Sequence, residues 1–347
     1  MESYEKIRRS EIDQKFFIDR LNDFLPEKVF DTHVHVWKLE HKGEARFPQR
    51  GEDWAEKIEY ENSIEAYKED VQNLFPGHSV SALLFGWISV NIDVAENNRY
   101  VGAAVKSNPG FAGLAVSCPF WSREETIAQV EGNGLIGMKP YITFSDSRIA
   151  TKDITIFDIL SREQLQLADE RGYVCMLHLP RPGRLPDPAN LRQLLEIEYR
   201  YPNARIIVAH VGRCYSEQDL GNAFELLKET KNMCFDFSGN TNSAVIRKAL
   251  ETFGDERVLY GSDLPLSHIH LKRIYNEAGH YINLINGSER PQINTASYMQ
   301  PMPEADGYTY YLYESIDAMR QAAEDLGLSR KQIENVFYNN AQRLIRR

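Results

Sequence analysis

Short apolar runs alternate with longer amphipathic segments over most of the chain. Eight of these runs have the length and the β-branched and aromatic content of strands. Several of the helix-like segments between them begin with Ser or Asn, residues that commonly cap helices. The predicted strands are residues 29–35, 80–87, 110–118, 135–141, 173–179, 205–211, 233–239 and 258–264. The predicted helices between them include residues 63–74, 161–171, 190–199 and 243–253.

This alternation predicts an α/β fold with parallel strands, because each return to a parallel neighbour needs a crossover segment. Eight strands are also the number that closes a (β/α)8 TIM barrel. An open doubly wound sheet fits the same alternation, but no GxGxxG follows the first strand and no GxxxxGK[ST] occurs anywhere. We therefore predict one barrel domain over residues 1–347, with residues 1–28 as an N-terminal helical extension.

Two long polar segments interrupt the alternation, residues 37–62 after the first predicted strand and residues 265–307 after the eighth. We expect both to be long loops, and loops of this length are usually functional or disordered. Both follow the carboxyl ends of strands, where barrel enzymes place their active sites. The C-terminal residues 311–326 and 329–346 predict helices that close the barrel.

Composition narrows the function classes. The 347 residues are 42% hydrophobic and 26% charged, which is typical of a globular protein rather than a disordered one. The net charge of −10 disfavours nucleic acid or an anionic membrane as the main partner, since both need a basic face. No apolar stretch approaches the roughly 18 residues of a membrane span, and the charged N-terminus lacks the apolar core of a secretory signal. We expect a cytoplasmic protein.

The four cysteines are scattered along the chain and form no CxxC pair. Three of them lie in apolar runs, so we predict buried free thiols in a reducing compartment. The cysteines are Cys118, Cys175, Cys214 and Cys234.

Candidate chemistry begins with His33 and His35 in DTHVH. Residues two apart on a strand face the same side, so both imidazoles can converge on one ion. An HxH alone is a weak signal, because two core histidines give the same pattern. His178, His210 and Asp263 strengthen it, since each stands at the end of a later predicted strand, and these ends share one rim of a barrel. The five residues together predict a metal site.

These motifs resemble the amidohydrolase superfamily. The HxH of the first strand, the histidines in MLHL and VAHVG and the aspartate in GSD match its pattern, and the terminal NAQRLI stretch is similar to the ending of the amidohydrolase 2 branch. That branch includes aminocarboxymuconate-semialdehyde decarboxylase and related hydrolases. The resemblance spans roughly residues 29–265 and does not cover the two long loops.

The resemblance implies one divalent metal ion held by His33, His35, His178 and Asp263. We expect zinc, with manganese as the alternative, because three histidines and an aspartate suit both ions. His210 would act as the acid/base beside the bound water or substrate, and Asp263 could be ligand, base or both. A bound divalent ion lowers the pKa of water to about 7, which would supply a nucleophile at neutral pH.

Lys139 in GMKPY leaves two functional interpretations open. In binuclear members of the superfamily, a lysine that ends the fourth strand is carboxylated and bridges two metal ions. An unmodified ammonium group would instead face the substrate, and we favour this second interpretation. A surface lysine without a role is the third alternative.

Cationic residues follow the same strand ends: Arg181 and Arg184 in HLPRPGR and Arg213 in HVGR. Because the planar guanidinium group suits carboxylates, we predict an anionic small-molecule substrate held by Arg213 with help from the others or from Lys139. Any single arginine is more often paired with an internal carboxylate. Tyr141 and His268 complete the predicted substrate-binding residues, which are Lys139, Tyr141, Arg181, Arg184, Arg213 and His268.

We predict a metal-dependent hydrolase of a small amide, lactone or related carbonyl compound. The alternative is a carbon–carbon lyase that decarboxylates an aromatic or unsaturated carboxylic acid, because the same ligands serve both reactions. A non-catalytic binding barrel fits less well, since the ligand set comes with an acid/base candidate. The sequence is also compatible with a homodimer.

Overall fold

The computed structural model describes residues 9–50, 57–286, 298–302 and 307–346. Residues 1–8 of the predicted N-terminal extension and parts of both predicted loops lie outside the described residues. Within the described residues, the chain forms a mixed α/β fold with parallel sheets, so this part of the prediction is confirmed.

The parallel strands form two sheets, with the orders β1-β2-β3 and β4-β5-β6-β7-β8-β9. Val29 of β1 pairs with Val80 of β2, and Cys175 of β6 pairs with Ile206 of β7. The strands are β1 (Lys28–His35), β2 (Ser79–Phe85), β3 (Ala112–Gly113), β4 (Ala115–Ser117), β5 (Gly137–Pro140), β6 (Val174–Leu177), β7 (Arg205–Val208), β8 (Met233–Asp236) and β9 (Val258–Leu259).

Each edge of the first sheet lies next to an edge of the second. Only Leu114 separates β3 from β4, and its amide donates a 2.8 Å hydrogen bond to the Leu84 carbonyl of β2. At the other end, the segment after β9 lies beside β1. The Thr32 amide donates to the Tyr260 carbonyl at 3.0 Å, and the His35 amide donates to the Leu264 carbonyl at 2.9 Å.

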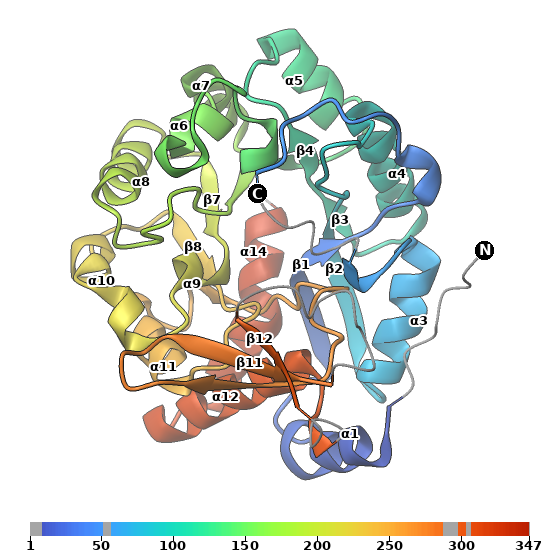
Figure 1. Ribbon diagram of the computed structural model, residues 1–347, viewed down its shortest axis with the longest axis vertical. Coiled ribbons are helices and arrows are strands. Elements are labelled where there is room, and N and C mark those ends of the chain that lie inside the picture. Colours follow the sequence, from blue (N-terminus) through green and yellow to red (C-terminus); the bar gives the residue numbers. More distant parts are fainter. Residues whose placement is uncertain (1–8, 51–56, 287–297, 303–306, 347) are drawn as a thin grey trace.

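Helices surround these strands (Figure 1). Ser63 and Ser161 cap α3 and α7 with their side-chain oxygens, as the sequence predicts. None of the helices within the described ranges has the length and apolarity that crossing a membrane requires. The helices are α1 (Glu11–Phe16), α3 (Ile64–Leu74), α4 (Val94–Ser107), α5 (Arg123–Val130), α6 (Ile156–Ile159), α7 (Arg162–Arg171), α8 (Pro188–Arg200), α9 (His210–Arg213), α10 (Ala223–Leu227), α11 (Ser243–Phe253), α12 (Tyr311–Leu326), α13 (Arg330–Glu334) and α14 (Asn340–Ile345).

All the predicted strands except the first are shorter in the structure than expected, and two of them run into left-handed backbone. The predicted strand 205–211 ends at Val208, because His210 and Val211 have φ values of 56° and 49°, which no strand can contain. The predicted strand 258–264 is regular only over Val258–Leu259, and Asp263 has a φ of 62°. Both departures turn side chains of candidate site residues out of the sheet.

The predicted loop 265–307 contains a small sheet that the sequence analysis misses. Strand β10 (Leu271–Tyr275) pairs antiparallel with β11 (Tyr281–Ile285), which pairs with β12 (Met299–Pro301). Leu271 and Arg273 are buried while the residues between and after them are exposed, so β10 has the alternation of a half-buried strand. Figure 1 shows this sheet in front of α11 and α12.

Candidate metal centre and its pocket

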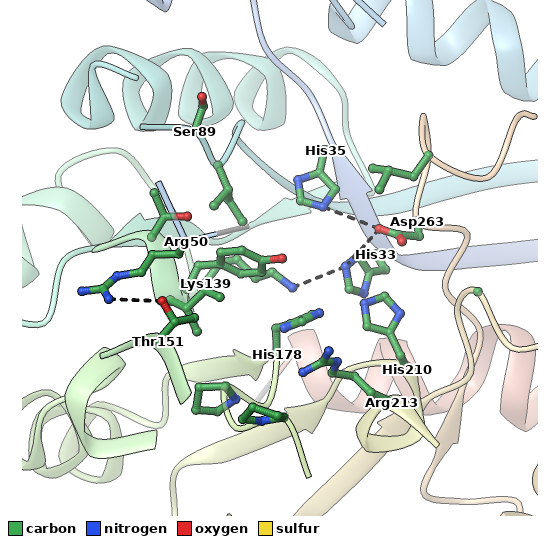
Figure 2. Close-up of a pocket in the computed structure, with 18 of the residues that line it drawn as sticks. His33, His35, Arg50, Ser89, Lys139, Thr151, His178, His210, Arg213 and Asp263 are labelled. Atoms are coloured by element: carbon green, nitrogen blue, oxygen red, sulfur yellow. Dashed lines mark hydrogen bonds and ion pairs between the residues drawn. The ribbon is translucent and has the colours of Figure 1, made fainter. Parts of the chain in front are cut away.

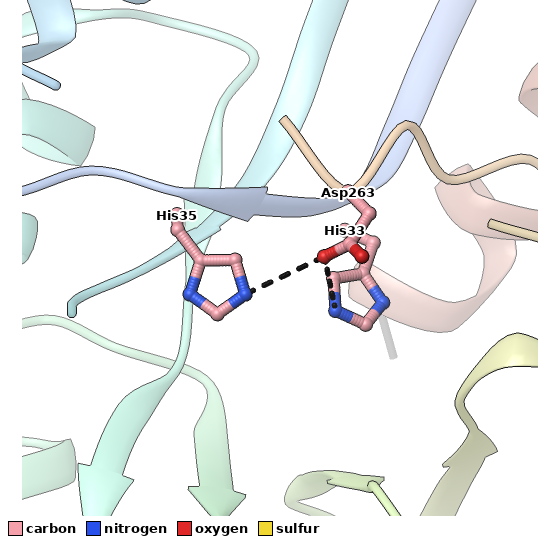
Figure 3. Close-up of side chains that lie close together, drawn as sticks. All are labelled: His33, His35 and Asp263. Carbon is pink, nitrogen blue, oxygen red and sulfur yellow. Dashed lines mark ion pairs between the residues drawn. The ribbon is translucent and has the colours of Figure 1, made fainter. Parts of the chain in front are cut away.

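His33 and His35 face the same side of β1, as their spacing predicts. Their Nε2 atoms lie 3.4 Å and 3.6 Å from Oδ1 of Asp263 (Figure 3). One potential ligand atom from each of these three residues lies within 4.8 Å of the other two. Three of the four predicted ligands therefore meet at one point.

Asp263 reaches this point because its backbone is left-handed and anchored to β1. Its amide donates a 2.8 Å hydrogen bond to the carbonyl of His33. The preceding amide, that of Ser262, donates at 2.8 Å to the carboxylate of Asp31. A non-glycine residue with positive φ is strained, and such strain is typical of functional sites.

Hydrogen bonds orient the imidazole rings. Nδ1 of His33 lies 3.1 Å from Oδ2 of Asp236, and Nδ1 of His35 lies 3.3 Å from the carbonyl of Gly86. Both partners accept hydrogen bonds, so the proton of each neutral ring belongs on Nδ1. This tautomer leaves the Nε2 lone pairs facing Asp263, in the form that binds a metal ion.

His178, the fourth predicted ligand, lies outside the three-residue cluster but lines the same cavity (Figure 2). Its Nδ1 atom is buried and has no hydrogen-bond partner among the described residues. Its ring centroid lies 5.4 Å from that of His210. An unpartnered buried nitrogen beside a ligand cluster is unfavourable unless a ligand or ion satisfies it.

His210 opens a left-handed turn rather than ending a strand. Residues His210, Val211, Gly212 and Arg213 have φ values of 56°, 49°, 66° and 66°. This turn brings the side chains of His210 and Arg213 to the cavity. Nδ1 of His210 lies 3.0 Å from the carbonyl of Ser238, so its Nε2 atom is the nitrogen left for substrate chemistry.

The protonation states of the candidate ligands favour the binding of a cation. Burial lowers the pKa of His33 to about 3, and it also lowers the pKa values of His35 and His178, so these rings are neutral at neutral pH. Burial alone would raise the pKa of Asp263, but its interactions with the imidazoles of His33 and His35, which gain charge only in acid, lower it to about 2. Neutral imidazoles and an ionised carboxylate are the donor set of a divalent metal site.

Lys139 is fully buried, so the surface alternative for this residue is wrong. Its Nζ atom lies 3.3 Å from Nε2 of His33 and 4.6 Å from the ring centroid of Phe85. Burial lowers the pKa of Lys139 to about 8. The cation therefore lies beside the ligand cluster and lines the cavity.

The predicted substrate-binding residues separate into two groups. Lys139, Tyr141 and Arg213 line the cavity, whose volume is about 450 Å³. Arg181 pairs with Asp187 at 2.9 Å and Arg184 pairs with Asp219 at 2.8 Å, outside the lining residues.

His268 also lies outside the lining residues. It is buried, and its Nε2 atom lies 2.9 Å from a carboxylate oxygen of Glu59. Arg181, Arg184 and His268 are therefore absent from the lining of this cavity, although the guanidinium group of Arg184 lies over the rings of Tyr215 and Tyr281, and their contact with a substrate stays a prediction.

Sequence reasoning missed several functional candidates. Asp236 ends β8 and, with His33 and His210, forms a second group of potential ligands within 4.8 Å. The small sheet and α12 add Tyr281, Tyr298 and Tyr311 to the cavity wall. No local signal marks the tyrosines, but Asp236 ends an apolar strand in the same way as His178 and could have been found by that rule.

The buried guanidinium group of Arg273 lies against tyrosines of the cavity wall. The guanidinium carbon of Arg273 lies 4.8 Å from the ring centroid of Tyr215, 4.5 Å from that of Tyr281 and 5.0 Å from that of Tyr311. Its nitrogen atoms donate to the side chains of Asn283 and Tyr311 and to the carbonyl of Gly239. Arg273 thus holds β10 and β11 against the cavity.

The comparisons agree with this picture. A family model described as amidohydrolase matches residues 30–347. No curated protein matches the chain. Solved structures similar in fold include an amidohydrolase from Burkholderia multivorans with bound HEPES, at 13% identity and a TM-score of 0.56, covering 91% of this chain and 98% of that chain.

Two further structures carry different activities in their descriptions. One is described as a probable 2-pyrone-4,6-dicarboxylic acid hydrolase from Acinetobacter baumannii with citric acid bound (16% identity, TM-score 0.55, covering 91% of this chain and 98% of that chain). The other is a dihydroxybenzoic acid decarboxylase from Polaromonas sp. JS666 with bound manganese and the inhibitor 2-nitroresorcinol (15% identity, TM-score 0.53, 92% and 97%). At these identities the likeness concerns the fold.

Proposed function

The chain belongs to the amidohydrolase family, and we propose that it is a metal-dependent hydrolase of a small carbonyl compound that carries a carboxylate. The observation that carries this proposal is the convergence of His33, His35 and Asp263 on one point of a cavity that His210 also lines. An amide or a lactone is the expected substrate class, since both present a carbonyl carbon to attack by water.

The proposed framework is a closed (β/α)8 barrel in a single domain. The hydrogen bonds from Thr32 and His35 to the segment after β9, together with the continuity of β3 and β4, support closure. In such a barrel the site lies at the carboxyl ends of the strands, and here β1, β5 and the segments that follow β6, β7 and β9 bring side chains to this cavity.

We assign His33, His35, His178 and Asp263 as ligands of one divalent ion. Zinc is the preferred ion because three of the four donors are imidazole nitrogens, and manganese is the alternative. Once bound, the ion would activate water and polarise a substrate oxygen. The unpartnered Nδ1 of His178 and the acceptors behind the rings of His33 and His35 support this assignment.

The chain's own residues would move the proton and hold the substrate. His210 presents Nε2 to the cavity, in reach of a water molecule or leaving group, and Asp263 is a second acceptor for that proton. Arg213 donates to the Leu179 carbonyl at 3.1 Å, and no carboxylate of the described part of the chain pairs with it within 4.0 Å. A substrate carboxylate is therefore the expected partner of Arg213.

Decarboxylation is the second candidate. Lys139 and Arg213 line the cavity together with the ligand cluster, so the cavity would also suit a substrate whose own carboxylate is the reacting group. In that reaction the bond between carbon and the carboxylate breaks, CO2 leaves, and the carbon atom would take up a proton from the protonated imidazole of His210, which Asp263 faces across the site.

Two probe compounds separate these candidates. Purified protein loaded with zinc or manganese is incubated with 2-pyrone-4,6-dicarboxylate and, separately, with 2,6-dihydroxybenzoate in 18O-labelled water. Hydrolysis predicts a product carrying solvent 18O, whereas decarboxylation predicts release of CO2. Chelation of the metal ion should abolish either reaction.

Elemental analysis of matched variants tests the ligand assignment. His33→Ala and His35→Ala should each lower metal content and turnover, whereas His78→Ala should change neither, because that imidazole bonds to the Pro26 carbonyl away from the cavity. Full metal content in both ligand variants would overturn the proposed function.

A further inference from the structure

We propose that Asp236 is a positioning residue that orients both the metal ligand His33 and the turn that carries His210 and Arg213. The inference rests on the proposed function, because it concerns the arrangement of that site. Asp236 ends β8, is completely buried, and touches the two histidines from behind rather than from the cavity.

One carboxylate oxygen of Asp236 sets the tautomer of His33. Oδ2 lies 3.1 Å from Nδ1 of His33, and both side chains are buried, so water does not compete for this contact. An ionised carboxylate can only accept hydrogen bonds, which places the single proton of the neutral imidazole on Nδ1. Nε2 then keeps its lone pair on the side of Asp263 and the cavity.

The other oxygen holds the start of the left-handed turn. Oδ1 accepts hydrogen bonds from the amides of His210, at 3.1 Å, and Ser238, at 3.0 Å. The hydroxyl of Ser238 donates to the same oxygen and lies 2.9 Å from Nδ1 of His210. Asp236 and Ser238 together therefore fix both the backbone and the ring of His210.

This anchoring matters because the turn is strained. A left-handed conformation is unfavourable for a non-glycine residue, because its Cβ atom lies too close to the following carbonyl oxygen. His210 and Val211 adopt it one after the other, and Arg213 adopts it again after Gly212. A buried acceptor for the first amide of the run stabilises a backbone that L-residues otherwise avoid, so the same carboxylate orients the ligand, the acid/base and the arginine.

The alternative is a purely structural aspartate that only satisfies buried amides. Asp236→Asn separates the two roles, because it is nearly isosteric and keeps an acceptor oxygen for the amides. Its amide NH2 would face Nδ1 of His33 and favour the opposite tautomer, with the proton on Nε2. A structural role predicts lower stability without a change in this tautomer.

The experiment measures zinc affinity by competition with a chelator of known affinity at a fixed pH. We expect Asp236→Asn to bind zinc about 10–100-fold more weakly than the wild type. The matched control is Asp317→Asn, because Asp317 of α12 is also buried but pairs with Arg20 and Arg320, away from the cavity. This control should bind zinc within about twofold of the wild type.

Nitrogen-15 NMR of the metal-free protein gives a readout that does not depend on turnover. In Asp236→Asn, the chemical shift of Nδ1 of His33 should become that of an unprotonated ring nitrogen, and the shift of Nε2 should become that of a protonated one. If that variant does not fold, Ser238→Ala keeps the carboxylate and removes only the hydroxyl contact, and it should shift the Nδ1 signal of His210 while leaving the tautomer of His33 unchanged.

Three results would overturn the inference. The first is a zinc affinity of Asp236→Asn within about threefold of the wild type. The second is a loss of zinc affinity in Asp317→Asn as large as that in Asp236→Asn. The third is a Nδ1 signal of His210 that does not change in Ser238→Ala. None of them affects the proposed function if the wild type binds one zinc ion and turns over a probe. Failure of the wild type to bind zinc or manganese would overturn both.

Discussion

Gly212, in the turn that carries His210 and Arg213, is in direct contact with Leu185. The amide of Leu185 donates a 3.0 Å hydrogen bond to the carbonyl of Gly212, and a Cβ atom on Gly212 would lie only 2.7 Å from Cβ of Leu185. Gly212 also has a φ of 66°. The position therefore requires glycine both for its backbone conformation and for its close neighbour.

Gly212→Ala should lower the free energy of unfolding by about 2 kcal/mol or more, because it combines left-handed strain with overpacking. It should also lower kcat, since His210 and Arg213 flank it in the turn. Urea denaturation and steady-state kinetics measure the two effects.

The matched control is Gly327→Ala. Gly327 has a φ of 63° at the end of α12, and nothing lies within 4 Å of the Cβ position. This variant should lose only about 1 kcal/mol and keep full activity. Equal losses of stability and of activity in Gly212→Ala and Gly327→Ala would show that the contact with Leu185 affects neither.

Arg213→Gln should raise KM about tenfold or more for a probe substrate that carries a carboxylate, because a hydrogen bond to a charged group contributes about 1.5–3 kcal/mol. Arg184→Gln is the comparison, since Arg184 pairs with Asp219 outside the lining of the cavity. It should change KM by less than about threefold. A larger effect at Arg184 than at Arg213 would contradict the assignment of the substrate carboxylate to Arg213.

Alkylation of the native protein at pH 8 should modify Cys234 before the other cysteines. Burial raises the pKa values of Cys118, Cys175 and Cys214 to about 12, so almost none of their reactive thiolate is present at that pH. Cys234 is only partly buried. Mass spectrometry after a brief treatment with iodoacetamide identifies the modified residue, and unfolding in urea should expose all four thiols.

Stability should depend on pH through Asp13. Burial raises the pKa of this carboxyl, but the hydrogen bond and charge of His270 outweigh burial and hold the pKa below its usual value of 3.8. A depressed folded-state pKa contributes stability that is present above the unfolded-state pKa and lost as the pH falls through the folded-state pKa. The wild type and Asp13→Asn should therefore differ more in their free energy of unfolding at pH 5.5 than at pH 3.5.

Urea denaturation of the metal-free proteins at the two pH values measures this difference. Asp19→Asn is the control, because Asp19 is exposed and forms an ion pair with Lys15 of the same helical segment. A difference for Asp13→Asn that stays constant with pH would mean that the His270 contact does not act through charge.

The site could be predicted from the sequence wherever its geometry is local. Two histidines at alternate positions of a strand face one side whatever the rest of the chain does, so the pairing of His33 and His35 followed from their spacing. The caps of α3 and α7 are local as well, because Ser63 and Ser161 bond to amides three residues away. The alternation of strands and helices is determined by the same short-range periodicity.

Other features depended on partners far away in the sequence. Arg181 and Arg184 follow the same strand end as His178, yet Asp187 and Asp219 neutralise them. Nothing near Arg213 in the sequence distinguishes it from these two arginines. The small sheet of β10 and β11 was missed because its polar residues, such as Arg273, are buried against tyrosines from other elements.

By itself, the sequence determined the order of strands and helices, the side of β1 on which its histidines lie, and the family pattern. Only the tertiary structure decided that Asp236 stands behind His33, across 203 residues, and that the backbone at His210 turns left-handed to meet it. The physical reason is the distance along the sequence over which each interaction acts. Periodicity and capping act over a few residues, whereas a buried carboxylate acquires its partners only when distant strands are packed side by side.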